Sequence, residues 1–301
     1  MLDIPPILLF GARGQLGWEL RRTLSTLGSV TTAGVDGADH HVDLTDLDSI
    51  SRVVAGVKPV LMVNAAAYTA VDRAEAELEL AQQVNADAVG HMGKLAAAID
   101  CPLVHYSTDY VFSGEGNMPW REQDEPDPRS VYGRTKLEGE NALAASGADF
   151  VILRTAWVYG ARGVNFMLTM QRLFRERDQL NIVADQYGAP TWSRHIAEAT
   201  AQILAQSRDP GKAGFGFNNN GGIYHLTAAG KASWHEFAEA ILQGTEADCK
   251  LVPITTEEYP CPATRPGFSV LNNERLKLVF GVSLPPWRQG LALCLDEQAS
   301  L

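Results

Sequence analysis

The stretch Ile7-Leu-Leu-Phe-Gly11-Ala-Arg-Gly14-Gln-Leu-Gly17 decides the fold of this chain. A short apolar run leads directly into glycines spaced three apart, and leucines then recur every three or four positions as far as Leu27. This pattern predicts a buried strand, a tight turn and a helix. Glycines here let backbone N–H groups approach a pyrophosphate at the helix N-terminus, so the stretch predicts a dinucleotide-binding loop.

Strands and helices alternate beyond this loop. The short apolar runs that predict strands lie at 7–10, 29–35, 60–63, 103–107 and 150–153. The segments that predict helices lie at 15–27, 45–57, 74–99, 132–145, 193–206 and 233–242. Continuously apolar strands alternating with helices are typical of a parallel sheet covered on both faces. The sequence therefore predicts an α/β protein with a doubly wound parallel sheet, whose dinucleotide-binding domain covers residues 1–156.

The alternation loosens in the second half of the chain, where a segment at 253–266 is punctuated by prolines. Residues 157–301 are predicted to form mainly a smaller, C-terminal substrate-binding domain. Ser233 and Glu236 have the spacing of a capping box at the start of a helix. We expect the chain to cross back to the first domain around residues 193–226.

Composition narrows the functional classes. The chain has 301 residues, is 46% hydrophobic and 20% charged, and carries a formal net charge of -11, which suits a globular protein but not a nucleic-acid binder. No apolar run approaches the roughly 20 residues that span a bilayer. The start MLDIPP lacks the basic residues of a signal peptide, and the cysteines have no paired spacing. We expect a cytoplasmic protein that binds neither nucleic acid nor membrane.

The residues after the second predicted strand leave the cofactor open between NADPH and NADH. Asp36 lies about 20 residues past the glycines, where an acid binds ribose hydroxyls, and Asp43 is a further candidate. No Lys or Arg lies in 30–42, but Arg13 in the glycine loop could pair with a 2′-phosphate. His40 and His41 are adjacent, but no third metal-ligand residue follows them at a spacing typical of metal sites, so no metal site is expected here.

A second motif carries acid/base chemistry. Tyr132-Gly-Arg-Thr-Lys136 places a phenol and an ammonium on one face of a helix, where the positive charge is expected to lower the pKa of Tyr132. Ser107-Thr108-Asp109 ends the fourth predicted strand, at the sheet edge that binds ligands, so Thr108 is expected to hydrogen-bond a substrate oxygen. Asn64-Ala-Ala-Ala67 ends the third strand with small residues that leave room for a cofactor.

The chain resembles a known family at these motifs. GxxGxxG after the first strand, NAAAYT at 64–69, YSTDYVF at 106–112 and YxxxK at Tyr132 are similar to the extended short-chain dehydrogenase/reductases, which have a Rossmann domain. More narrowly, the chain resembles the dTDP-4-dehydrorhamnose reductases. The segments that carry this resemblance are VDRAE at 71–75, RTAWVYG at 154–160, DQYGAPT at 185–191 and TRPGFS at 264–269.

The resemblance implies an NAD(P)H-dependent oxidoreductase that reduces the 4-keto group of dTDP-4-dehydro-L-rhamnose (dTDP-6-deoxy-L-lyxo-4-hexulose) to dTDP-L-rhamnose. This is the last step in making a precursor of bacterial surface polysaccharides such as O-antigen lipopolysaccharide. Tyr132 would donate the proton, Lys136 would hold the nicotinamide ribose and lower the pKa of Tyr132, and Thr108 would hydrogen-bond the keto oxygen. The residues expected to contact the nucleotide sugar are Asp109, Tyr110 and Trp157, with Arg265 at its phosphates because a guanidinium fork matches them.

The expected cofactor site joins the glycine loop, the strand ends and the positions implied by the resemblance. Its residues are Gly11, Arg13, Gly14, Gln15, Leu16, Gly17, Asp36, Asp43, Leu44, Ala66, Ala67, Tyr68, Thr69, Tyr106, Tyr132 and Lys136. The sequence departs from the family where an acid would close the second strand, because Gly34 stands there. It also departs at a Mg²⁺ site between subunits, since Glu19 matches one glutamate but Arg194 replaces another. We therefore expect no Mg²⁺ and a monomer or weak homodimer.

Two other functions stay open. The first is another enzyme of nucleotide sugars, an epimerase or dehydratase, but dehydratases usually place an acid after the STD strand end, and here Tyr110 follows. The second is a noncatalytic dinucleotide-binding subunit, which the chain resembles through the regulatory subunit of methionine adenosyltransferase. Retention of Thr108, Tyr132 and Lys136 together argues against a noncatalytic role.

Overall fold

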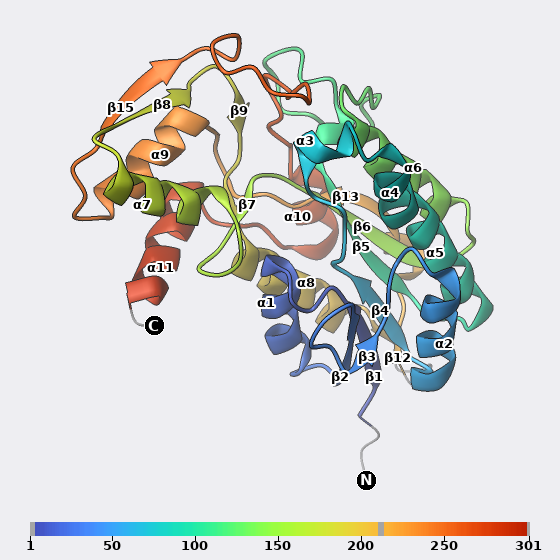
Figure 1. Ribbon diagram of the computed structural model, residues 1–301. Helices are drawn as coiled ribbons and strands as arrows, with labels where there is room; N and C mark the ends of the chain where they lie inside the picture. Colours follow the sequence, from blue (N-terminus) through green and yellow to red (C-terminus); the bar gives the residue numbers. More distant parts are fainter. Residues whose placement is uncertain (1–3, 210–213, 300–301) are drawn as a thin grey trace.

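The larger of the two lobes is built on one parallel sheet of seven strands (Figure 1). The computed structural model describes residues 4–209 and 214–299. The strand order is β13-β6-β5-β4-β1-β2-β3, and every neighbouring pair is parallel. The strands are β1 (Pro6–Phe10), β2 (Ser29–Gly34), β3 (His40–His41), β4 (Leu61–Asn64), β5 (Leu103–Thr108), β6 (Phe150–Thr155) and β13 (Gly222–His225). The predicted doubly wound sheet is thus confirmed, and its order reverses at β1.

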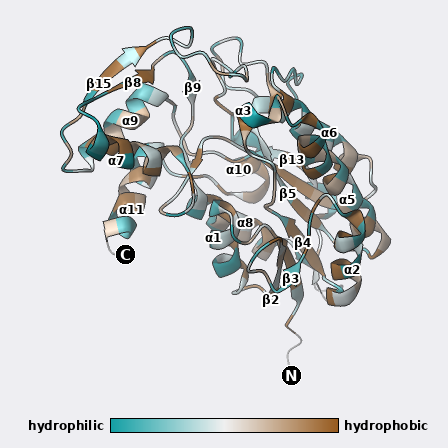
Figure 2. Ribbon diagram, viewed as in Figure 1, coloured by the Kyte–Doolittle hydropathy of each residue, from teal (hydrophilic) through white to brown (hydrophobic). Residues whose placement is uncertain are grey.

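Helices cover both faces of this sheet, and the strands β1, β4, β5 and β6 are buried along almost their whole length. One apolar core lies between the sheet and the helices α1 (Gln15–Leu24), α8 (Ser193–Gln206) and α10 (Glu274–Phe280). The other lies between the sheet and α2 (Leu47–Val57), α5 (Ala88–Ala98) and α6 (Val131–Ala144). Figure 2 shows the apolar strands between helices whose polar sides face outward.

The helix predicted over 74–99 is confirmed from Leu78 onward, but it begins four residues later than predicted and contains a π turn. The segment forms α3 (Val71–Ala74), α4 (Leu78–Gln82), a π turn η1 (Gln83–Asp87) and then α5. The Asn85 side chain sits in the π turn and bonds the backbone N–H and carbonyl of Tyr68, at 2.8 and 3.1 Å, and the hydroxyl of Thr135. Glu75, in the break after α3, accepts the Val131 N–H at the start of α6. These side-chain bonds favour the break after α3 and the π turn over a regular α-helix.

The smaller lobe has its own apolar core, which packs around Met167, Phe237 and Trp287. Its elements are β7 (Val158–Tyr159), α7 (Phe166–Glu176), β8 (Gln179–Val183), β9 (Tyr187–Gly188), β10 (Thr191–Trp192), β14 (Ala232–Ser233), α9 (Trp234–Gln243), β15 (Lys250–Ile254) and α11 (Trp287–Ala299). The predicted capping box is confirmed: Ser233 Oγ accepts the Glu236 N–H, and the Glu236 carboxylate accepts the Ser233 N–H.

The chain passes between the lobes several times. After β10 it returns to the larger lobe, where α8 packs on α1 and β13 pairs with β6. Between them lie the short elements β11 (Arg208–Asp209), β12 (Gly214–Phe215) and η3 (Asn218–Asn220). Within the parts of the chain that the structure describes, every helix is too short or too polar to span a bilayer.

Candidate active site

A groove of about 770 Å³ runs along the carboxyl ends of the strands at the point where the sheet order reverses. This edge is where open α/β sheets bind ligands. Every residue predicted for the cofactor lines the groove except Gly17 and Tyr68. Tyr68 instead donates its hydroxyl to Glu77 at the start of α4. The structure therefore brings together almost the whole predicted cofactor site.

The glycine loop leaves a helix N-terminus open to the groove. Gly11 has a φ of 78°, and a Cβ there would lie 2.6 Å from the backbone nitrogen of Ala66. Gly17 faces the loop rather than the groove, since its Cβ would lie 2.0 Å from the Gly11 carbonyl oxygen. The N-cap of α1 is Gly14, and no side chain caps the first turn. Open N–H groups at a helix start fit the pyrophosphate of a dinucleotide.

Charged residues of both signs line the far end of the groove. The Arg13 guanidinium lies against the loop after β2, where a Cβ on Gly37 would approach Nη1 to 2.6 Å. Asp36 lines the same end of the groove. Asp43 accepts the N–H and hydroxyl of Thr45, at 2.9 and 2.8 Å, and these bonds lower its pKa. Both a guanidinium for a phosphate and carboxylates for a ribose are thus present.

Tyr132 lies at the first turn of α6 beside the end of β5. Ser130 caps this helix by accepting the Gly133 N–H at 3.1 Å. The Tyr132 hydroxyl is hydrogen-bonded to Thr108, and its ring meets Tyr110 edge-on at 5.7 Å. Burial raises the pKa of Tyr132 to about 12, although the bond with Thr108 opposes the rise. The phenol is therefore protonated at neutral pH.

The predicted lowering of the Tyr132 pKa by Lys136 is wrong for this structure, since burial outweighs other effects on the phenol. The Lys136 ammonium is turned toward β5: it donates to the Tyr106 carbonyl at 2.7 Å and lies 3.2 Å from Nε2 of His105. Burial lowers the pKa of Lys136 to about 8, and the nearby Glu140 carboxylate opposes this. Lys136 still lines the groove.

Asp109 connects the end of β5 to the smaller lobe. Thr108 donates to its Oδ1 at 3.0 Å, and Ser269 also bonds the carboxyl. Burial raises the pKa of Asp109 to about 7, and its Oδ2 has no hydrogen-bond partner among the residues that the structure describes. An unpartnered buried oxygen beside Tyr132 suits a hydroxyl of a bound sugar.

Arg265 crosses from the smaller lobe to α3. Its Nη2 donates to Asp72 Oδ2 at 2.7 Å, and Asp72 also accepts the Ala263 N–H at 3.3 Å. The Arg265 hydrogen bond lowers the pKa of Asp72, and a second guanidinium nitrogen contacts the Cys261 thiol. The Arg265 charge also acts on Tyr110, which places it near the acid/base residues.

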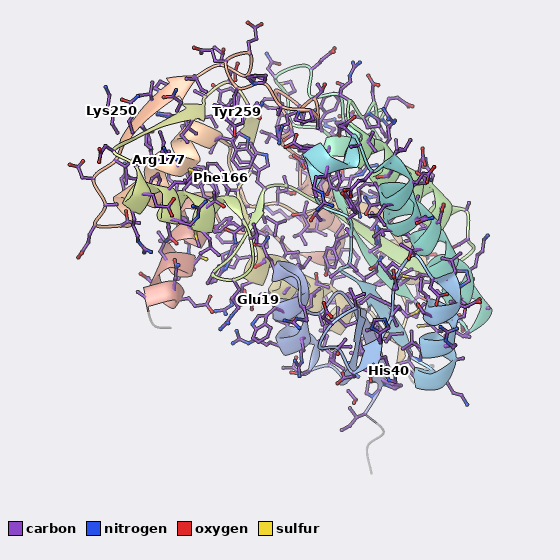
Figure 3. The ribbon with its side chains drawn as sticks, in the orientation of Figure 1. Glu19, His40, Phe166, Arg177, Lys250 and Tyr259 are labelled. Atoms are coloured by element: carbon purple, nitrogen blue, oxygen red, sulfur yellow. The ribbon has the colours of Figure 1, made fainter. Side chains whose placement is uncertain are left out.

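Trp157 is held by the smaller lobe. It has a left-handed φ of 47°, which bulky residues rarely adopt, and its indole stacks on Trp234 with ring centroids 3.5 Å apart. Phe166, labelled in Figure 3, packs on the same Trp234 ring at 4.6 Å. A strained residue fixed by an aromatic stack is a feature of ligand sites.

Several groove residues were not predicted. Ser107 and Thr155 line it with buried hydroxyls that have no partner among the described residues. Ser107 ends the predicted strand 103–107 and Thr155 lies two residues past the predicted strand 150–153, so the rule that selected Thr108 could have found them. The loop containing Val164 also lines the groove, because Gln15 donates to the Val164 carbonyl and accepts from Asn165. No sequence pattern signals that long-range contact.

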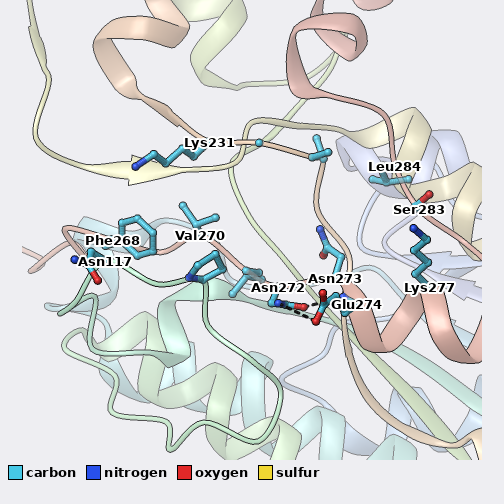
Figure 4. Close-up of a pocket in the computed structure, with 15 residues that line it drawn as sticks. Asn117, Lys231, Phe268, Val270, Asn272, Asn273, Glu274, Lys277, Ser283 and Leu284 are labelled. Atoms are coloured by element: carbon cyan, nitrogen blue, oxygen red, sulfur yellow. Dashed lines mark hydrogen bonds between the residues drawn. The ribbon is translucent and has the colours of Figure 1, made fainter.

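A second cavity, of about 470 Å³, lies where the chain passes between the lobes (Figure 4). It is lined by segments 228–231 and 270–274, and Lys231 lies over the rings of Tyr187 and Phe268 at 5.0 and 5.6 Å. None of the predicted site residues lines it. Almost all of the predicted cofactor residues, with the pair Tyr132 and Lys136, therefore belong to the groove and not to this second cavity.

Glu19 and Arg194, the two residues that align with the family's Mg²⁺ site between subunits, form an ion pair with each other. Arg194 Nε donates to Glu19 at 3.2 Å, and a second nitrogen contacts Glu297 (Figure 3 labels Glu19). His40, also labelled there, is exposed at the sheet edge. Among residues 4–209 and 214–299, no three His, Cys, Asp or Glu side chains are grouped to hold a metal.

A parallel dinucleotide fold with a glycine loop and a Tyr–Lys pair on the helix beside the groove defines the extended short-chain dehydrogenase/reductase class. The model of the family described as RmlD substrate binding domain matches residues 6–300. The chain is 46% identical to the dTDP-4-dehydrorhamnose reductase of Burkholderia thailandensis over 302 residues, covering 98% of this chain and 99% of that protein.

Solved structures agree. The dTDP-4-dehydrorhamnose reductase of Clostridium acetobutylicum matches with a TM-score of 0.89 and 37% identity, and that of Bacillus anthracis, in complex with NADP, with 0.88 and 30%. Each match covers 98% of this chain and 99% of the other. The chain belongs to the dTDP-4-dehydrorhamnose reductase family, so the resemblance seen in the sequence is confirmed.

Proposed function

We propose that this protein catalyses the NAD(P)H-dependent reduction of dTDP-4-dehydro-L-rhamnose to dTDP-L-rhamnose, the last step of dTDP-rhamnose synthesis. The observation that carries the proposal is a protonated, half-buried Tyr132 that is hydrogen-bonded to Thr108 beside the groove, in a chain of this family. A phenol that stays protonated at neutral pH can donate a proton to a keto oxygen.

The groove residues fit a dinucleotide, which when bound supplies the hydride for the keto carbon. The open N-terminus of α1 would hold the pyrophosphate, and the small residues Ala66 and Ala67 would leave room beside the sheet. Tyr132 donates its proton to the keto oxygen, and Thr108 hydrogen-bonds the same oxygen. Lys136 holds the ribose next to the nicotinamide with the N–H that faces the groove.

The opposite side of the site would bind the nucleotide sugar. The free Oδ2 of Asp109 accepts a sugar hydroxyl, and Tyr110 and Trp157 contact the sugar ring. Arg265 binds the phosphates with its guanidinium, which Asp72 already holds toward the site at 2.7 Å. Support for this placement comes from Ser269 and Arg265, which bring one segment of the smaller lobe to Asp109 and Tyr110.

Arg13 favours NADPH in this proposal. Its guanidinium lies beside the loop after β2 and would pair with a 2′-phosphate, while Asp36 would bind ribose hydroxyls when NADH is used. The Bacillus anthracis relative was solved in complex with NADP, which supports this choice.

The test is oxidation of NADPH and NADH, followed by their absorbance, with enzymatically generated dTDP-4-dehydro-L-rhamnose and identification of the product sugar. We expect oxidation coupled to dTDP-L-rhamnose, faster with NADPH at limiting cofactor. Cofactor binding without oxidation would support a noncatalytic role instead. A different product sugar would assign the chain to another reaction on nucleotide sugars.

A further inference from the structure

His105 lies inside β5 directly beneath α6, with none of its surface exposed. We propose that His105 is a positioning residue, whose neutral ring accepts a hydrogen bond from the Lys136 ammonium and thereby aims the remaining N–H of Lys136 into the groove. This inference rests on the role proposed above for Lys136. A histidine within an apolar strand has no distinctive spacing, so the sequence by itself does not mark His105 as functional.

The alternation of side chains along β5 brings His105 to Lys136. Val104 and Tyr106 point to the core beside α1 and α8, so His105 points to the opposite face, under α6. The distance from its Nε2 to Lys136 Nζ is 3.2 Å. An ammonium has three N–H donors. The Tyr106 carbonyl takes one at 2.7 Å and His105 takes another, which leaves one for the groove.

The ring is in the state that this role needs. Burial and, to a smaller extent, the Lys136 charge hold the pKa of His105 well below its usual range, so the imidazole is neutral and has one acceptor nitrogen. With Nε2 accepting from Lys136, the ring proton lies on Nδ1. That nitrogen donates to the Asn64 backbone at the end of β4, a bond that opposes the lowering of the His105 pKa. The Asn64 side-chain nitrogen lies 3.1 Å from Nδ1 and is itself a donor, because the amide oxygen accepts the Ala66 N–H; this amide favours the opposite tautomer, so the position of the ring proton is the decisive measurement.

The other groups that face Lys136 cannot replace this acceptor. Tyr132 and Glu140 lie on the same helix as Lys136, and Glu140 is committed to Arg154 of β6 at 2.6 Å, with both side chains at most 2% exposed. Without His105, one N–H of a buried ammonium would lose its partner. The charged form of Lys136 would then be less favourable and its orientation less restricted.

The experiment compares H105Q with H105L in the full-length protein. Glutamine can place an oxygen near the position of Nε2, whereas leucine fills the space without an acceptor. We expect H105L to lower kcat about tenfold, the value of one hydrogen bond to a charged group, and to move the alkaline limb of the kcat–pH profile about one unit lower. H105Q should recover most of both.

His225 provides a matched control. It is also fully buried, on β13, but its ring contacts the Trp120 carbonyl rather than Lys136, and burial lowers its pKa to about 3. H225L should lower the melting temperature as H105L does, without moving the alkaline limb. An unchanged limb in H105L, or the same shift in H225L, would overturn the proposal.

A measurement on the unmodified protein separates this proposal from the reaction itself. Nitrogen NMR of ¹⁵N-histidine-labelled protein should show His105 with its proton on Nδ1 at neutral pH. A proton on Nε2, or on both nitrogens, contradicts the proposal even if the enzyme is active. Wild-type protein that does not reduce the nucleotide sugar contradicts the proposed function, while the NMR result still decides the state of His105. The same spectrum decides the question if H105L does not fold.

Discussion

The two walls of the site are built in different ways. On the larger lobe, Tyr132 and Lys136 project from a capped helix against the central strand β5, and both are held by hydrogen bonds. On the smaller lobe, Trp157 and Arg265 lie on irregular segments, fixed by an aromatic stack and by one carboxylate. Regular elements hold reacting groups more firmly than loops do. The comparison therefore assigns proton transfer to the first wall and recognition of the substrate to the second.

The largest expected effect is on the first wall. Y132F removes only the proton donor, so kcat should fall by roughly 10²–10⁴-fold, the usual contribution of a general acid. Cofactor affinity, measured by fluorescence titration, should change little. Tyr259, which is 58% exposed and labelled in Figure 3, provides the control variant Y259F, expected to keep wild-type turnover. Wild-type turnover in Y132F would remove this residue from the mechanism.

The next largest effect is on stability and comes from Asp109, which bonds Thr108 on the larger lobe and Ser269 on the smaller lobe. Its folded-state pKa of about 7 lies above the unfolded value, so the folded protein binds more protons between about pH 4 and pH 7. The contribution of Asp109 to the free energy of unfolding is fully present below about pH 4. It falls by up to about 4 kcal/mol as the pH rises from about 4 to about 7. D109N cannot ionise. Urea unfolding at both ends of the window should show a smaller loss in D109N than in wild type, and equal losses would contradict the raised pKa.

A smaller effect is expected on the second wall. R265A removes a charged hydrogen-bond donor at the proposed phosphate site, so KM for the nucleotide sugar should rise about 10- to 100-fold with little change in kcat. Arg172 lies in the same lobe and forms a surface pair with Glu176. R172A is the control and should keep both constants. A loss of kcat alone in R265A would break the proposed division between the walls.

The cofactor end of the groove should show a weaker effect still. R13A is expected to lower kcat/KM for NADPH about tenfold, because one charge-assisted contact to the 2′-phosphate is lost. NADH carries no such phosphate and serves as the internal control. Equal losses with both cofactors would place Arg13 at the pyrophosphate or in the fold instead.

The smallest effect is expected from Mg²⁺. Arg194 occupies the carboxylate of Glu19, and its positive charge opposes a cation there. Light scattering after size exclusion should give the same mass with Mg²⁺ and with EDTA. A mass that rises with Mg²⁺ would show that the pair opens to bind the metal.

Much of the first wall was predictable, because it follows from local pattern. The glycine loop, the predicted strands of the sheet and the helix over 193–206 are confirmed, since apolar periodicity and the position after a strand specify them. The π turn within the helix predicted over 74–99 was not predicted, because the bonds of Asn85 to Tyr68 and Thr135 join distant parts of the chain. Ala-rich periodicity cannot show such bonds.

The electrostatic state of the site was less predictable. The four-residue spacing of Tyr132 and Lys136 suggested an ammonium that lowers the phenol pKa, but spacing does not show burial or where Nζ points. The structure turns Nζ to His105 and Tyr106, and burial raises the pKa of the phenol. Helical spacing brings two side chains to one face, and only packing decides which partner each one meets.

The sequence by itself determined the doubly wound sheet, the dinucleotide groove and the family, because each depends on motifs that are contiguous in the chain. Only the tertiary structure decided that Glu19 meets Arg194, that Asp72 holds Arg265, and that the ammonium of Lys136 rests on a buried histidine. The first two contacts join residues more than a hundred positions apart, and the third depends on the register between a helix and a strand. Burial then sets the pKa of each group, and burial is a property of the packed molecule.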